Sequence, residues 1–339
     1  MLRMPGNPFG VVVTPDDRWA FVAVETSIQV LKITRNSSTP TAARSVPVPG
    51  GARGEAVTSD GRYVLAANGS GAVVIDVARA TRGDGARAVL GTLSDPRLGG
   101  GQGSAIEVAL SPGDDYAFVT NEYSDLAAVY NLRKALTDGF RPSDYVGAIP
   151  LGQAAVGMAV SPDGRWLYAT SESAAHRAGQ TGTLSVISVS RAESDPARSV
   201  VATVDAGCNP VRVITSANGS EVWVTARASD DLLCFVASRL RTDPSRALVA
   251  VVRVGELPVG LAMTNGGSRI VVADSDRFIV RGAAASLSVV NVAAALAGKP
   301  AVTGYLPAGQ FPREMALEPG GRVLLVTNFG SGQLEAVGV

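Results

Sequence analysis

Apolar and polar positions along the chain follow one pattern that recurs seven times. Each copy has a short run rich in Val and Ala, a tight turn such as Ser-Pro-Asp-Gly, and a second apolar run that often carries an aromatic residue. Short apolar runs on either side of Pro-Asp-Gly or Asn-Gly turns predict β-hairpins. The seven copies span residues 10–24, 54–68, 107–121, 157–171, 212–226, 260–274 and 314–328.

Two further strands are expected after each hairpin. Residues 183–189 and 286–292 read as third strands, and residues 199–207 and 301–309 read as fourth strands. Helix-forming segments, such as 131–139, separate the two. The copies recur about every 51 residues, which is the period of a propeller blade. We therefore predict an all-β fold, a single domain over residues 1–339 that forms a seven-bladed β-propeller with four-stranded antiparallel blades.

The last copy differs from the others at its outer edge. The chain stops after its third strand, residues 334–339, while residues 1–4 precede the first copy in the place of a fourth strand. A closed ring leaves no exposed sheet edge between its first and last blades. We therefore predict that the N-terminal strand completes the seventh blade.

The composition narrows the classes of function. The 30 basic residues balance 30 acidic ones, which argues against binding of nucleic acid or of an anionic membrane. One His and two Cys, Cys208 and Cys234, exclude multi-histidine metal centres and iron–sulfur clusters, and leave the pairing of the thiols open. Without a signal segment or a long apolar run we expect a cytoplasmic monomer that acts on a small molecule, with a trimmed secreted form as the alternative.

Charged residues recur where the inner strands begin. The equivalent positions of the seven copies are Gly10, Gly54, Glu107, Gly157, Arg212, Gly260 and Glu314. Arg53, Glu55 and Arg313 flank them. We expect these charges to meet at one mouth of the central channel, where burial shifts pKa values. They form either a catalytic site or a structural ion network that plugs the channel.

The loops between second and third strands add further candidates at the same face. They carry Glu172 and Arg227, and the long segment 172–182 contains His176, whose ordinary pKa suits proton transfer near neutral pH. Asn121, Asp274 and Asn328 end the second strand at equivalent positions. With Glu107 or Glu314 they could hold Ca²⁺, although a role in building the strand ends is favoured. We otherwise expect no metal and no cofactor.

Residues 111–121 and 161–171, SPGDDYAFVTN and SPDGRWLYATS, resemble the YVTN repeat. The seven copies are similar to those of the lactonase-type seven-bladed propellers, which include 6-phosphogluconolactonase-like proteins. This resemblance implies an active site at the channel mouth built from Arg, Glu and sometimes His. It carries over by position only, to Glu107, Arg212 and Glu314, because no contiguous catalytic motif is shared. A WD40 scaffold is disfavoured, since the chain has no Trp-Asp pattern.

The leading hypothesis is an acid–base enzyme for a small anionic or oxygenated substrate, of the lactone-hydrolysing or lactonizing type. Glu107 or Glu314 would act as general base, His176 as general acid, and Arg212 as the anchor for an oxyanion. The expected substrate-binding residues are Arg53, Glu55, Asn121, Glu172, Arg227, Asp274, Arg313 and Asn328. A non-catalytic binding scaffold and a biosynthetic cyclase or isomerase are the alternatives. An open mouth would favour an enzyme, and a channel sealed by mutual salt bridges would favour a scaffold.

Overall fold

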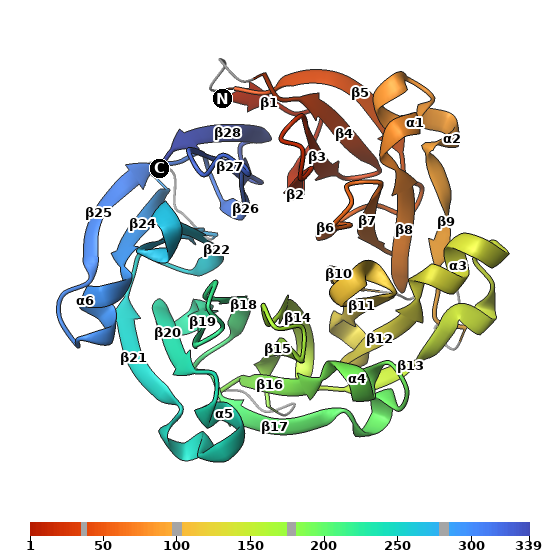
Figure 1. Ribbon diagram of the computed structural model, residues 1–339. Coiled ribbons are helices and arrows are strands. Elements are labelled where there is room, and N and C mark those ends of the chain that lie inside the picture. The colour runs from red at the N-terminus through yellow and green to blue at the C-terminus, as the bar shows by residue number, and fades with distance from the viewer. Residues whose placement is uncertain (35–38, 97–103, 175–180, 278–284) are drawn as a thin grey trace.

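Seven four-stranded antiparallel sheets surround a central channel in the computed structural model (Figure 1). The structure describes residues 1–34, 39–96, 104–174, 181–277 and 285–339. In blades 1 to 6 the strands are paired in chain order, with the first strand at the channel and the fourth at the rim. This arrangement confirms the predicted seven-bladed β-propeller.

The strands of the first four blades follow the predicted repeats. Blade 1 contains β2 (Pro8–Val13), β3 (Trp19–Val24), β4 (Ser27–Lys32) and β5 (Thr41–Pro47). Blade 2 contains β6 (Glu55–Val57), β7 (Tyr63–Asn68), β8 (Gly71–Asp76) and β9 (Val89–Leu93). Blade 3 contains β10 (Ala105–Leu110), β11 (Tyr116–Asn121), β12 (Leu126–Asn131) and β13 (Tyr145–Pro150). Blade 4 contains β14 (Gln153–Val160), β15 (Trp166–Ser173), β16 (Thr183–Ser188) and β17 (Val200–Asp205).

The remaining blades complete the ring. Blade 5 contains β18 (Pro210–Thr215), β19 (Glu221–Ala226), β20 (Asp231–Val236) and β21 (Leu248–Arg253). Blade 6 contains β22 (Pro258–Thr264), β23 (Arg269–Asp274), β24 (Ser286–Asn291) and β25 (Val302–Pro307). Blade 7 contains β26 (Pro312–Leu317), β27 (Val323–Asn328), β28 (Gln333–Gly338) and, from the other end of the chain, β1 (Leu2–Arg3).

The N-terminal strand closes the ring as predicted. β1 pairs antiparallel with β28, with Leu2 opposite Leu334 and Arg3 opposite Gln333. The Met4 amide also donates to the Gly332 carbonyl at 2.9 Å. The two ends of the chain therefore share one blade.

Within the described residues, short helices lie between the third and fourth strands of blades 2 to 6, on the outside of the ring (Figure 1). They are α1 (Val77–Arg82), α2 (Gly85–Ala88), α3 (Leu132–Asp138), α4 (Val189–Ala192), α5 (Arg239–Thr242) and α6 (Val292–Leu296). Asn131 and Asn291 cap α3 and α6, each accepting a backbone N–H at 2.8 Å. Among the helices of the described residues, none is long and apolar enough to cross a membrane.

The recurring turn has a hydrogen-bond pattern that explains its sequence. In blade 1 the Thr14 hydroxyl donates to the Asp16 carboxylate at 2.6 Å and accepts from the Trp19 amide at 3.1 Å. Thr58 and Asp60 repeat the first bond in blade 2 at 2.7 Å. The polar residues of the repeat thus fix the hairpin that joins the first and second strands.

The hydrophobic core is distributed between neighbouring blades. One cluster of buried side chains joins Leu65 and Val74 of blade 2 to Val119 and Tyr130 of blade 3. Further clusters of this kind link other pairs of blades, including blades 7 and 1. The second strands, such as β3 and β11, are therefore buried on both faces, which explains why they read as nearly continuous apolar runs.

Threonine side chains connect adjacent inner strands around the channel. The Thr225 hydroxyl accepts from the Arg212 amide at 3.1 Å in its own blade and donates to the Val259 carbonyl of blade 6 at 2.7 Å. Thr120, Thr170 and Thr327 make the equivalent pair of bonds in blades 3, 4 and 7. These contacts hold the backbone that carries the channel side chains.

Candidate functional site

A β-bulge in the inner strand turns two consecutive residues toward the channel. In six blades the pairing of first and second strands shifts register across such a pair, for example between Ala105 and Val108 and between Pro210 and Val213. In blade 2, Arg53 and Gly54 occupy the same position just before β6. The second residues of these pairs are the seven positions singled out from the sequence, and the first residues precede them by one.

The first residues of the pairs all line one cavity at the channel mouth, which we call the mouth cavity. Its volume is 510 Å³, within the range of roughly 300–1,000 Å³ typical of small-molecule sites. Five arginines and three glutamates line it among the described residues, so its charge favours an anion. They are Arg53, Arg212, Arg227, Arg277, Arg313, Glu25, Glu122 and Glu172.

Arg313 is the first residue of the blade 7 pair, and aromatic rings surround its guanidinium. The Arg313 Cζ atom lies 3.6 Å from the centre of the Phe9 ring, 5.6 Å from that of Phe311 and 5.8 Å from that of Phe329. Such contacts stabilise a buried cation by about 0.5–2 kcal/mol. No carboxylate of the described residues forms an ion pair with Arg313, and its Nε has no hydrogen-bond partner there. Burial, and then the charge of Arg212, lower the pKa of Arg313 to about 9.

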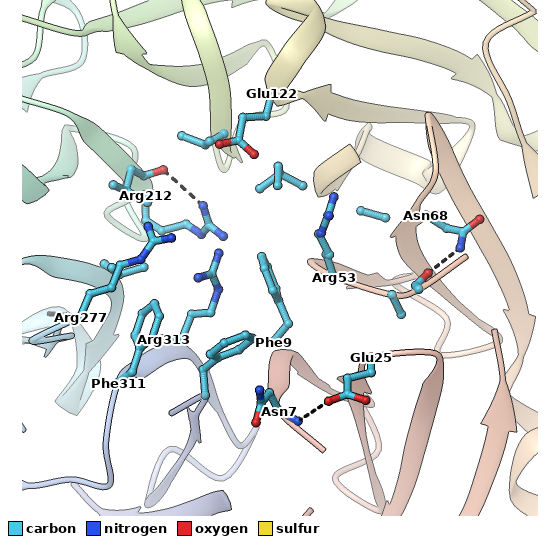
Figure 2. Close-up of a pocket in the computed structure, with 18 of the residues that line it drawn as sticks. Asn7, Phe9, Glu25, Arg53, Asn68, Glu122, Arg212, Arg277, Phe311 and Arg313 are labelled. Carbon is cyan, nitrogen blue, oxygen red and sulfur yellow. Dashed lines mark hydrogen bonds between the residues drawn. The ribbon is translucent and has the colours of Figure 1, made fainter. Parts of the chain in front are cut away.

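Arg53 approaches the cavity from the other side of Phe9, so that Arg313, Phe9 and Arg53 follow one another on blades 7, 1 and 2 (Figure 2). One Arg53 nitrogen, Nη1, donates to the Ala105 carbonyl at 3.0 Å. No ion pair of Arg53 with a carboxylate is formed within the described part of the chain. The remaining donors of this guanidinium are left for water or a ligand.

Glu122 faces these arginines from across the cavity (Figure 2). It begins a 3₁₀ turn, Glu122–Ser124, that follows the second strand of blade 3. Burial, and then the nearby charge of Glu172, raise the pKa of the Glu122 carboxyl above its ordinary value, although Arg53 and Arg313 partly oppose this. A raised pKa makes a carboxyl group better able to hold a proton and to donate it as a general acid.

Glu172 and Arg227 lie in the mouth cavity as predicted, but they bind each other. Arg227 Nη2 lies 2.9 Å from Glu172 Oε2, and the Asn209 side chain donates to the same oxygen at 3.4 Å. Both side chains are partly exposed at 17%. This pair forms one wall of the cavity and neutralises its own charge.

Glu107, Arg212 and Glu314 are brought together, as expected, but within the channel. Arg212 Nε lies 2.8 Å from Glu314 Oε1 and 3.3 Å from Glu107 Oε2, and Arg212 Nη2 also contacts Glu314. Arg212 lines the mouth cavity, whereas both glutamates line a second cavity of 370 Å³ further along the inner strands of blades 1, 2 and 7, which we call the lower cavity. The salt-bridged group therefore separates the two cavities.

The close approach of neighbouring inner strands explains why four of the seven second residues are glycines and only three carry a charged side chain. A Cβ atom added at Gly260 would lie 2.1 Å from the Arg313 carbonyl oxygen, and one at Gly10 would lie 2.4 Å from that of Arg53. Neighbouring inner strands thus approach too closely for a side chain at these positions. Backbone crowding around the channel is thus the reason for glycine at these positions, as the sequence suggested.

Burial shifts the pKa values of Glu107 and Arg212. It raises the pKa of Glu107 to about 8, although Arg212 opposes the rise. For Arg212 burial alone would lower the pKa, but Glu314 and Glu107 hold it above the ordinary value for arginine. Burial therefore favours the protonated form of Glu107 although a cation lies beside it.

Glu55 belongs to the lower cavity and not to the mouth where it was expected. Its side chain is 7% exposed, and its Oε2 accepts from the Ala23 amide at 3.1 Å. Burial raises the pKa of Glu55 well above the ordinary range, with a smaller contribution from Glu107. Blade 1 has Ala23 at the repeat position of Thr225, so it lacks the connecting hydroxyl, and the Glu55 carboxyl bonds to the Ala23 amide.

Asn121, Asp274 and Asn328 do not line the mouth cavity; each is buried inside its blade. Asp274 accepts from Ser286 at 2.8 Å and from Ser288 at 2.9 Å, and Asn328 donates to Glu335 at 3.0 Å. The Asp274 carboxylate thus joins the second and third strands of its blade, whereas Asn121 and Asn328 donate through their side-chain nitrogens and their side-chain oxygens have no hydrogen-bond partner among the described residues. Within the described residues there is no cluster of acidic, His or Cys side chains suited to a metal ion.

Two other sequence predictions have different outcomes. His176 lies outside the described residues, so its proposed role as a general acid stays a prediction.

Cys208 and Cys234 are free thiols, and burial raises the pKa of Cys234 to about 12. A thiol with so high a pKa is unreactive at neutral pH.

The sequence interpretation overlooked the aromatic residues at the mouth, namely Phe9, Phe311 and Phe329. An alignment of the seven copies contains the signal for Phe9, because it stands one position before Gly10, as Arg53 and Arg313 stand before Gly54 and Glu314. Strict alternation along a strand assigns only one of two consecutive residues to the channel. The bulge overrides that alternation.

Comparisons with known proteins agree with the fold. No protein-family model matches the chain, and neither does any curated protein sequence. Among solved structures, a chain of Kuenenia stuttgartiensis hydrazine synthase is similar with a TM-score of 0.76 at 16% identity, over 99% of this chain and 96% of that one. A chain of a mitotic checkpoint complex is similar with a TM-score of 0.74 at 14% identity, over 100% of this chain and 90% of that one. At such identities the likeness establishes a seven-bladed β-propeller and no activity.

Proposed function

We propose that the protein is an enzyme that binds a small anionic or oxygenated substrate in the mouth cavity and transfers a proton to or from it. The observation that carries this proposal is the pair of guanidinium groups of Arg53 and Arg313, which have no ion-pair partner among the described residues and face Glu122 across the cavity. Arginines held in this way orient a carboxylate or an oxyanion.

The reaction class that fits this arrangement is the opening or closing of a lactone ring. In the opening direction, water adds to the carbonyl carbon and releases one proton to solvent, the ring C–O bond breaks, and the ring oxygen takes up a proton, so that a hydroxy acid forms. The arginines would stabilise the negative charge that forms on the carbonyl oxygen. Glu122, with its raised pKa, would donate the proton to the leaving oxygen or, in the reverse direction, remove it. The similarity of the repeats to lactonase-type propellers supports this choice of chemistry.

This assignment moves the acid–base role from Glu107 and Glu314 to Glu122. The two channel glutamates line the lower cavity and bind Arg212, so a substrate in the mouth cavity meets Glu122 first. Arg212 keeps a supporting role, since it lines the mouth cavity while it is held by the carboxylates. His176 remains a candidate for a second proton-transfer group.

One observation favours a second candidate function, a scaffold that binds a small anion without transforming it. Glu107, Arg212 and Glu314 neutralise one another in the channel, which is the arrangement expected of a plugged, structural network. A cyclase or isomerase would use the same groups of the mouth cavity as the hydrolase.

The test is a turnover screen with lactones and the corresponding hydroxy acids, followed by the variant Glu122→Gln. We expect the variant to lose about 100-fold or more in kcat, together with the limb of the pH–rate profile that Glu122 contributes. Glu221→Gln, a change at the opposite end of a second strand, serves as the matched control. Turnover that is unchanged in Glu122→Gln would rule out this role, and binding without turnover across the screen would favour the scaffold.

A further inference from the structure

The first residues of the six bulge pairs, together with Arg53 at the same position of blade 2, form a ring around the channel, which we call the mouth ring. Its members all line the mouth cavity and derive from equivalent positions of the seven blades. In chain order they are Phe9, Arg53, Ile106, Val156, Val211, Val259 and Arg313.

The mouth ring has two chemically different sides. Arg313, Phe9 and Arg53 stand on the consecutive blades 7, 1 and 2, whereas the positions of blades 3 to 6 are aliphatic. The aliphatic members are 2–5% exposed and belong, with Phe9, to one continuous cluster of apolar side chains. A ligand on the floor of the cavity therefore meets cations on one side and hydrocarbon on the other.

The cationic side suits a planar anionic group. The Arg313 guanidinium stacks 3.6 Å from the centre of the Phe9 ring, which leaves the edge that carries its N–H groups directed away from the ring face. A guanidinium edge matches the two oxygens of a carboxylate. Arg277, whose Cζ lies 5.8 Å from the centre of the Phe311 ring, adds positive charge on the same side.

The aliphatic side disfavours a ligand with many hydroxyl groups. Ile106, Val156, Val211 and Val259 offer no side-chain donor or acceptor, and a hydroxyl buried against them loses its bond to water without replacement. The same surface gains free energy when it covers apolar atoms of a ligand. Glu25 on the cavity wall would in addition repel a dianion such as a phosphate ester.

Resting on the function proposed above, we propose that the mouth cavity takes a small monocarboxylate with an apolar body. Arg313 and Arg53 bind the carboxylate, and Ile106, Val156, Val211 and Val259 contact the apolar part. Such a ligand lies across the mouth ring with its carboxylate end near Phe9, between the two arginines. Glu122 then faces it from above the ring.

Calorimetric titration with four simple probes tests this assignment. Hexanoate combines both features, hexan-1-ol lacks the carboxylate, gluconate has a carboxylate on a polyhydroxylated body, and hexyl phosphate has a dianionic head. We expect hexanoate to bind at least about tenfold more tightly than each of the others. Tighter binding of gluconate or of hexyl phosphate than of hexanoate would overturn the proposal.

Substitutions in the mouth ring test which residues contact the carboxylate and the apolar part of hexanoate. Arg313→Gln should weaken hexanoate by about tenfold or more, and Val211→Thr, which places a hydroxyl on the aliphatic side at nearly constant volume, should weaken it as well. Arg62→Gln, which removes an exposed cation far from the channel, is the matched control. If Arg313→Gln does not fold, Arg313→Lys keeps the charge but not the planar group. Hexanoate binding that none of the ring variants changes would overturn the proposal.

The two proposals fail in different ways. Tight hexanoate binding by a protein that turns over no lactone or hydroxy acid would support the ligand class and contradict the enzyme. Turnover of a polyhydroxylated substrate together with no measurable binding of hexanoate would support the enzyme and contradict the ligand class.

Discussion

At Glu107, burial and ion pairing act in opposite directions. Arg212 lies 3.3 Å from the carboxylate and favours its charged form, yet burial raises the pKa of Glu107 to about 8. The folded protein therefore holds a proton that the unfolded chain, with an ordinary value of 4.5, has already released. A carboxyl group whose pKa is raised by folding contributes most to stability below its pKa in the unfolded chain. This contribution is lost as the pH rises through its pKa in the folded protein.

This difference predicts a pH dependence of stability that Glu107→Gln reduces. Between about pH 5 and 8 the group lowers the free energy of unfolding by at most about 1.4 kcal/mol per pH unit. The variant should be relatively more stable than the original protein at pH 8 than at pH 5, as measured by urea denaturation. Glu256→Gln, at an exposed position, is the control. A parallel pH profile for Glu107→Gln and the original protein would show that the proton is held elsewhere.

Within an element, the bulge of the inner strand decides which chemistry reaches the channel. The pair Arg313 and Glu314 shows the effect, since the first side chain lies in the mouth cavity among aromatic rings and the second lines the lower cavity. A threonine of the second strand holds the pair in place. In blade 5, for example, Thr225 accepts from the amide of Arg212, the second residue of that pair, and donates to the Val259 carbonyl of the next inner strand.

We therefore expect Thr225→Val to destabilise the fold although it preserves the volume of the side chain. The change removes two hydrogen bonds and leaves a buried N–H and a buried C=O without their partner, which costs about 1–3 kcal/mol. Chemical denaturation measures the loss. Thr92→Val, on the exposed fourth strand of blade 2, should change the stability by less than about 0.5 kcal/mol. Equal effects of the two substitutions would contradict the connecting role of Thr225.

For the whole molecule, the ring depends on the pairing of β1 with β28. Removal of residues 1–4 deletes this pairing and the side chain of Met4, which is 6% exposed in the cluster between blades 7 and 1. We expect a loss of about 2–4 kcal/mol and a melting temperature lower by several degrees. Removal of Met1 alone, which is 62% exposed, is the control. A melting temperature unchanged by the longer deletion would show that β1 is dispensable.

The sequence predicted the ring of blades well because its signals are local. Apolar runs and Ser/Thr-Pro-Asp-Gly turns lie within about 15 residues of one another, and the equivalent positions of the copies place Glu107, Arg212 and Glu314 in one channel. The sequence did not distinguish the mouth from the channel below it. That distinction depends on the consecutive pairs of the inner strands, whose first residues, such as Phe9 and Arg313, lie at the mouth, whereas Glu107 is a second residue and Glu55 follows the pair of blade 2.

We expect the shared seventh blade to be the last part of the ring to form. The partner of β1 lies at the far end of the chain, so this contact has the longest loop to close and the highest entropic barrier. Every earlier blade can assemble from residues that are close in sequence. The mouth ring is complete only after this final contact, since Arg313 of blade 7 must come beside Phe9 of blade 1. A ligand that bridges the two would therefore report directly on ring closure.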